Sequence, residues 1–129
     1  MNWIRVAAVT GALGVITGAF GAHALKEVLT AAQLITYEKG VMYQFYHTFA
    51  LLAVGILSMR TPSRLLNISG WLFLIGIIFF SGSVYLLSTH DIIGFTAYKV
   101  LGPVTPLGGL CFIGGWVTLL MHTFTKPLN

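Results

Sequence analysis

Residues 11–25 read GALGVITGAFGAHAL, and this stretch predicts a membrane-spanning helix with one smooth face. Its glycines recur at steps of three, four and three residues, which places them on one side of a helix. They are Gly11, Gly14, Gly18 and Gly21. Residues 4–24 carry no charge except Arg5, and a run of this length crosses a bilayer. Because a glycine face lets helices approach closely, we expect this helix to be the spine against which the others pack.

The composition is that of an integral membrane protein. Of the 129 residues, 57% are hydrophobic and only 8% are charged, whereas soluble domains carry about 25% charged residues. This length corresponds to a single domain, residues 1–129. The formal net charge of +4 includes no basic run, so nucleic acid is not an expected partner. The lipid bilayer is an expected partner, since juxtamembrane lysines and arginines attract anionic lipid.

The N-terminal segment also has features of a signal peptide. Arg5 precedes an apolar run, and Ala22-His23-Ala24 has the small-x-small pattern of a cleavage site. The apolar run, however, exceeds the ~7–15 residues of a signal-peptide core, and further spans follow it. We therefore expect the segment to remain as the first span.

The single cysteine, Cys111, excludes an internal disulfide and predicts no zinc or redox motif.

Three more spans are predicted along the chain. Residues 25–40 are expected to form an interfacial helix in part, with a capping box from Thr30 to Gln33 where a helix starts and continues into the second span. The second, third and fourth spans are predicted at about 41–59, 65–88 and 106–124. For the fourth, Thr105 is the expected cap, and Pro106 suits the first turn.

Four spans place both termini on the same side of the membrane. Basic residues number four on that side and three on the other, which favours an N-in, C-in orientation. The first group is Arg5, Arg60, Arg64 and Lys126, and the second is Lys26, Lys39 and Lys99. The fold class predicted from these observations is an all-α membrane protein, a bundle of four transmembrane helices.

Polar residues gather in the predicted outer half of the spans, while the inner half is nearly all apolar. The candidate ligand-binding residues are His23, Tyr43, His47, Ser81, Ser83 and Thr105. Polar side chains in lipid face the bundle interior or a water-filled cavity, so an outward-facing polar cavity is predicted. In it the histidines would supply switchable charge, and free N–H groups after Thr105 would receive an anion. The alternative is that His47 only joins two helices by a hydrogen bond.

Three kinds of chemistry are weakly indicated. A haem would need His23 and His47 as ligands, but their depths differ. A copper site from Met42, His47 and Cys111 lacks compact ligand spacing. A hydrolase would combine Ser81 or Ser83 with His47, and Asp91 is the sole acid nearby. We therefore predict no catalytic residue, no metal and no cofactor.

Four motifs, one in each span, resemble a known family. They are Gly18–His23, Tyr43–Thr48, Phe80–Tyr85 and Thr105–Gly109. They are similar to the YgdD-like small inner-membrane proteins, catalogued as domain of unknown function 423. The resemblance covers essentially the whole chain. It implies a bacterial inner-membrane protein of four spans and brings no established substrate or reaction.

Two functions of different classes remain open. The first is a non-enzymatic membrane protein whose outer polar cavity binds or passes a small ligand or lipid headgroup. The second is a structural or stabilising subunit of a larger membrane complex, with a partner on the glycine face or on residues 71–80. Because four spans in one copy make a thin bundle, a homo-oligomer is a further possibility.

Overall fold

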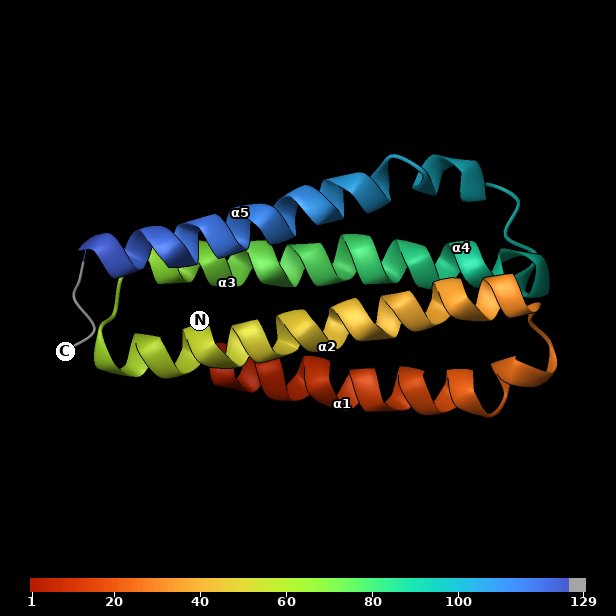
Figure 1. Cartoon of the computed structure of the whole chain (residues 1–129), viewed down its shortest axis with the longest axis horizontal. Helices are drawn as coiled ribbons and strands as arrows, with labels where there is room; N and C mark the ends of the chain where they lie inside the picture. Colours follow the sequence, from red (N-terminus) through yellow and green to blue (C-terminus); the bar gives the residue numbers. More distant parts are fainter. Residues whose placement is uncertain (126–129) are drawn as a thin grey trace.

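The computed structural model describes residues 1–125, and every long element in that range is a helix (Figure 1). The five α-helices are α1 (Trp3–Ala22), α2 (Ala31–Arg60), α3 (Arg64–Gly76), α4 (Gly82–Ile93) and α5 (Val104–Thr125). A π-helical segment, η2 (Ile77–Ser81), joins α3 to α4, and short 3-10 turns lie at Leu25–Glu27 (η1) and Tyr98–Leu101 (η3).

Within residues 1–125, four stretches are long and apolar enough to cross a membrane. They are Trp3–Glu27, Ala31–Arg60, Arg64–Ile93 and Tyr98–Thr125. The predicted fold, an all-α bundle with four spans, is thereby confirmed. Lys126, which the orientation prediction counted, lies outside the described residues.

The helices lie side by side in chain order, with α1 and α5 at the two edges (Figure 1). The central helix is α2, which contacts α1, α3, η2 and α4, whereas α1 packs along α2. The expectation that the first span is the spine is therefore wrong. The glycine side of α1 faces one neighbour only, and residues elsewhere on its surface, such as Val9 and Ile16, are exposed.

The contact between α1 and α2 is close at the glycines. A Cβ added at Gly14 would lie 3.0 Å from the Phe45 ring, and one at Gly18 would lie 3.3 Å from Val41. At the two ends of the stripe, Gly11 faces Thr48 and Gly21 faces Tyr37. All four neighbours belong to α2, so the glycine stripe of α1 is occupied within the chain.

The start of α2 differs from the predicted interfacial helix over 25–40. Thr30 caps α2: its Oγ1 accepts a hydrogen bond from the Gln33 N–H (3.3 Å), and the Gln33 Oε1 accepts from the Thr30 N–H (3.0 Å). From this cap α2 runs without a break to Arg60. Residues 31–40 are therefore the first turns of the second spanning helix, and only the turn Leu25–Glu27 precedes them.

The connection between α4 and α5 begins at a glycine and ends earlier than the sequence predicts. Gly94 ends α4 with φ +66°, a conformation that L side chains rarely adopt. The last helix begins at Val104, before the predicted start, so Thr105 lies within its first turn and is not the cap. The Thr105 hydroxyl is instead 2.6 Å from the Ser83 hydroxyl, and Pro103 O accepts from the Leu107 N–H (3.4 Å).

The apolar core lies where α1, α2 and α3 meet and extends to α5. Trp3, Leu51, Leu66 and Phe73 are almost completely buried in it. Ser69 is also fully buried, and its Oγ donates to Gly115 O of α5 (2.8 Å). The core therefore holds the middle of the bundle together, while the two edge helices leave grooves beside it.

Candidate functional site

The first groove lies between α1 and the long helix formed by α3, η2 and α4. We call it the α1 groove; its volume is about 610 Å³. Its walls are mainly apolar, and several of the wall residues are exposed to the surroundings, including Val9 and Ile78. It is lined by Arg5, Val6, Val9, Thr10, Leu13, Thr17, Gln44, Leu74, Ile77, Ile78, Ser81, Gly82 and Tyr85.

The Gln44 side chain joins three helices beside the α1 groove. Its Nε2 donates to Thr10 O of α1 (2.8 Å), and its Oε1 accepts from the Tyr85 hydroxyl of α4 (2.7 Å). Nearby, the Tyr37 hydroxyl donates to Thr17 O (2.8 Å). Gln44 is buried, so these bonds replace water that the amide cannot reach. Apart from Arg5, the polar side chains that line this groove are therefore hydrogen-bonded within the protein.

Sequence reasoning missed this amide and its partners as a unit. The signal was available, because Gln44 is an uncharged amide within an apolar span. Thr10 and Thr17 also alternate with Gly14 and Gly21 at steps of four, three and four, which puts them on one stripe of α1. A stripe of small and hydroxyl residues facing an amide is typical of a polar contact between membrane helices.

The second groove lies between α2 and α5, and we call it the α5 groove. Its volume is about 590 Å³, and its lining residues carry no fixed charge and are all absent from the α1 groove. Aromatic rings build its wall. The Tyr43 ring stacks on Phe80 (centroids 4.6 Å apart), and the His47 ring lies on Phe112 (3.4 Å).

His47, which lines the α5 groove, has both ring nitrogens occupied. Its Nδ1 lies 2.8 Å from Tyr43 O, and its Nε2 accepts from the Trp116 Nε1–H (3.3 Å). A carbonyl on one side and an N–H on the other match the neutral ring with its proton on Nδ1. The surroundings of His47 therefore favour an uncharged imidazole that joins α2 to α5.

The other predicted site residues lie in separate places. The Ser81 Oγ donates to Gly40 O (2.8 Å) and borders the α1 groove. Ser83 and Thr105 bond to each other between α4 and α5, and His23 is exposed at the end of α1. Together with Tyr43 and His47 in the α5 groove, the six candidates are thus spread over four locations rather than gathered around one cavity.

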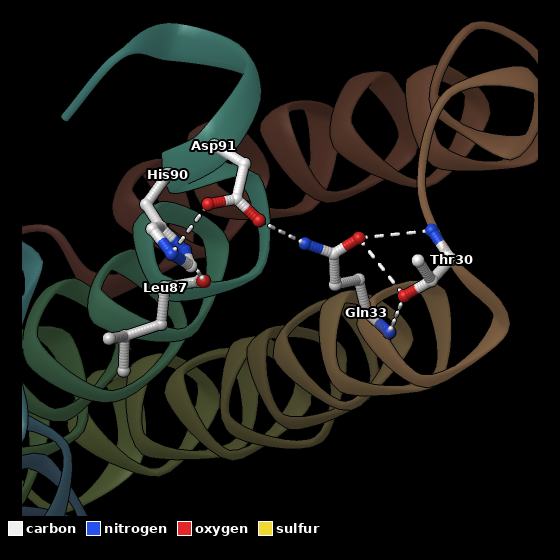
Figure 2. A network of polar contacts seen from close by, with 5 residues as sticks. All are labelled: Thr30, Gln33, Leu87, His90 and Asp91. Carbon is white, nitrogen blue, oxygen red and sulfur yellow. Dashed lines mark hydrogen bonds and ion pairs between the residues drawn. The ribbon is translucent and has the colours of Figure 1, made fainter.

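A polar network ties the end of α4 to the start of α2 (Figure 2). Asp91 lies between His90, whose Nε2 is 2.9 Å from Oδ1, and Gln33, whose Nε2 donates to Oδ2 (2.9 Å). The His90 Nδ1 is 2.7 Å from Leu87 O. Both neighbours of this ring are hydrogen-bond acceptors, whereas the Nε2 of His47 faces a donor.

Catalytic and metal chemistry find little support in the described part of the chain. Within residues 1–125 no group of three or more His, Cys, Asp or Glu side chains is placed to hold a metal ion. Every buried side-chain nitrogen and oxygen in the same range has a hydrogen-bond partner. Some of these bonds join two helices, as those of Ser69 and Ser81 do, and others, such as those of Ser88, stay within one helix.

Comparisons with known proteins agree with the helical membrane fold. The profile of a family described as "Protein of unknown function (DUF423)" matches residues 17–109. A UPF0382 membrane protein of Staphylococcus saprophyticus is 44% identical over 95% of this chain and 96% of its own length. Relatives with the same description from Staphylococcus haemolyticus and Staphylococcus aureus are 42% and 45% identical, each over 95% of this chain and 94% of their own. No solved structure matches.

Proposed function

The chain belongs to the DUF423 family of membrane proteins of unknown function, and we propose that it binds the hydrocarbon chain of a lipid in the α1 groove. In this proposal it is a non-enzymatic protein of a bacterial cytoplasmic (inner) membrane. This keeps ligand binding as the function predicted from the sequence. It moves the site from a polar cavity in the outer half to an apolar groove along α1.

The observation that carries the proposal is the open, apolar side of the α1 groove. Val9, Leu13 and Ile78 line it and are 60%, 50% and 58% exposed. In a bilayer these side chains meet lipid, and a groove of about 610 Å³ is within the ordinary range of ligand sites. An alkyl chain lying in it would exchange lipid contact for closer contact with three helices.

The polar groups beside the groove favour hydrocarbon over a polar ligand. Gln44 is engaged by Thr10 and Tyr85, and Ser81 by Gly40. A sugar or a free amino acid entering the groove would have to break these bonds or leave its own groups unpaired, and either is costly in an apolar medium. An alkyl chain makes no such demand.

Two glycines allow a matched test. A Cβ at Gly82, in the α1 groove, meets nothing within 4 Å, and one at Gly109, in the α5 groove, meets only Phe80 at 4.0 Å. Gly82→Leu and Gly109→Leu therefore fill one groove each without a backbone clash. After gentle solubilisation, native mass spectrometry counts the lipids that remain bound.

We expect Gly82→Leu to lose retained lipid and Gly109→Leu to keep the wild-type amount. Val9→Phe fills the α1 groove from the opposite wall and should act as Gly82→Leu does. Circular dichroism checks that each variant keeps its helix content. If folded Gly82→Leu and Val9→Phe retain lipid as the wild type does, the proposal is wrong.

A structural subunit remains the second candidate, and exposed apolar residues outside both grooves favour it. Because the glycine stripe of α1 is covered by α2, a partner protein or a second copy would sit elsewhere. Trp71 and Phe79 are 42% and 40% exposed and lie in the predicted partner surface, residues 71–80. If Trp71→Ala and Phe79→Ala removed a co-purifying protein or reduced the oligomer mass while lipid retention stayed unchanged, this second function would be favoured.

A further inference from the structure

Arg5 gives the α1 groove a charged end. It is the one charged residue among those that line the groove. Its side chain is exposed, and within residues 1–125 the single ion pair joins His90 to Asp91, so the Arg5 guanidinium has no acidic partner there. A cation at the end of an apolar groove is complementary to an amphiphile with a negative headgroup.

The same end of the bundle is positively charged overall. Arg60 ends α2 and Arg64 starts α3, so both belong to the connection that lies at the N-terminal end of α1. The three acidic residues, Glu27, Glu38 and Asp91, all lie toward the opposite end, near the α1–α2 and α4–α5 connections. Juxtamembrane arginines without neighbouring acids attract anionic lipid.

The length of the groove fits one leaflet. Along α1 it reaches from Arg5 to Thr17, a helical rise of roughly 18 Å. Half of a hydrocarbon core that is about 30 Å thick is about 15 Å. A long arginine side chain extends its charge toward the headgroups while its stem stays in the apolar region. An acyl chain whose phosphate sits at Arg5 would therefore reach the deep end of the groove near the bilayer centre.

We infer that the α1 groove binds an anionic phospholipid from the leaflet on the N-terminal side, with its phosphate at Arg5 and one acyl chain along α1. This inference rests on the proposed function, because it names the headgroup of the lipid whose chain occupies the groove. By the predicted orientation this is the cytoplasmic leaflet.

The test uses the full chain in mixed micelles that contain equal amounts of dioleoyl phosphatidylglycerol and dioleoyl phosphatidylcholine. The two lipids have the same chains and differ in net headgroup charge. Native mass spectrometry gives the ratio of the two bound lipids. Wild-type protein should prefer phosphatidylglycerol, and Arg5→Gln should lower that preference roughly fivefold, the size expected for one arginine facing an anionic headgroup.

Two controls separate a site from a general attraction. Arg60→Gln removes the same charge from the same end but lies outside the groove lining, and it should lower the ratio much less than Arg5→Gln does. Arg5→Lys keeps the charge and should keep most of the preference. If Arg5→Gln and Arg60→Gln lower the ratio equally, or if the wild type binds both lipids equally, the headgroup inference is overturned.

The same experiments distinguish a failure of the headgroup inference from a failure of the proposed function. If the ratio does not depend on Arg5 but Gly82→Leu still removes both lipids, the groove binds acyl chains without headgroup selection. If Gly82→Leu and Val9→Phe leave the amounts of both lipids unchanged, neither the groove nor its headgroup site binds lipid, and both proposals fall together.

Discussion

The α1 groove and the α5 groove are similar in size but are built from different chemistry. Beside the α1 groove, Gln44 and Tyr85 are hydrogen-bonded, the walls are aliphatic, and Arg5 stands at one end. The α5 groove has aromatic walls, with His47 against Phe112, and carries no fixed charge. In both, the polar groups hold helices together. The grooves differ in what they offer a ligand, because only the α1 groove combines an aliphatic channel with a cation.

The largest expected effect comes from separating α5 from the rest of the bundle. A Cβ at Gly108 would collide with the backbone N of Phe80, so Gly108→Val forces α5 away from η2. Overpacking of this kind costs about 1–3 kcal/mol, and more where backbone must move. Thermal unfolding in detergent should show a clear loss of stability. Gly109→Val is the control, since its nearest contact is 4.0 Å; equal stability of the two variants would contradict the packing.

The next effect concerns the polar contact beside the α1 groove. Gln44→Leu removes bonds to Thr10 O and the Tyr85 hydroxyl, and we expect a loss of about 1 kcal/mol, since such bonds contribute roughly 0.6 kcal/mol each in membranes. Thr118→Val is the control, because its hydroxyl bonds only within α5. Chemical denaturation of Gln44→Leu, Tyr85→Phe and the double variant measures the coupling; strictly additive losses would mean that the two side chains do not interact.

The corresponding contact in the α5 groove should contribute less. Trp116→Phe removes the N–H group from which His47 Nε2 accepts a hydrogen bond (3.3 Å). The bond is long, so we expect a loss at or below about 0.6 kcal/mol. The same denaturation measurement, with His47→Leu and the double variant, tests it. A loss larger than that of Gln44→Leu would reverse the comparison and make the α5 groove the more strongly joined region.

The smallest effect is expected at the network in Figure 2, which joins α2 to α4 beyond both grooves. Asp91 is 65% exposed, so Asp91→Ala should cost about 0.2–1 kcal/mol. Its readout is local: hydrogen exchange should speed up at the end of α4 and stay unchanged around Trp116. Unchanged exchange at both places would show that this network does not hold the helix ends.

The spanning helices were predictable because long apolar runs leave few alternatives in a membrane. The Thr30 cap was predictable for a local reason, since Gln33 is in reach from three residues away. The central position of α2 was not. A glycine stripe shows that α1 has one close neighbour, but it does not say which helix touches the most others.

The candidate site was predicted only from how deep each residue lies in the membrane, and this depth does not determine in which direction its side chain points. Tyr43 and Gln44 are consecutive in sequence and nearly level, yet they line different grooves, because successive residues of a helix point about 100° apart. Grouping Tyr43 and His47 with Ser81 therefore joined residues that belong to different grooves. Gln44 was not among the candidates, although a buried amide in a span needs partners as much as a histidine does.

The π-helical segment η2 makes the length of the third span as important as its composition. Such a segment corresponds to one extra residue within an α-helix. The wide turn absorbs that residue without rotating α4, whereas deleting one residue between this segment and Tyr85 would turn everything after the deletion by about 100°. Tyr85 would leave Gln44, while Phe73, before the segment, would stay in the core. Single-residue insertions and deletions in this span should therefore be far less tolerated in evolution than substitutions of its lipid-facing side chains.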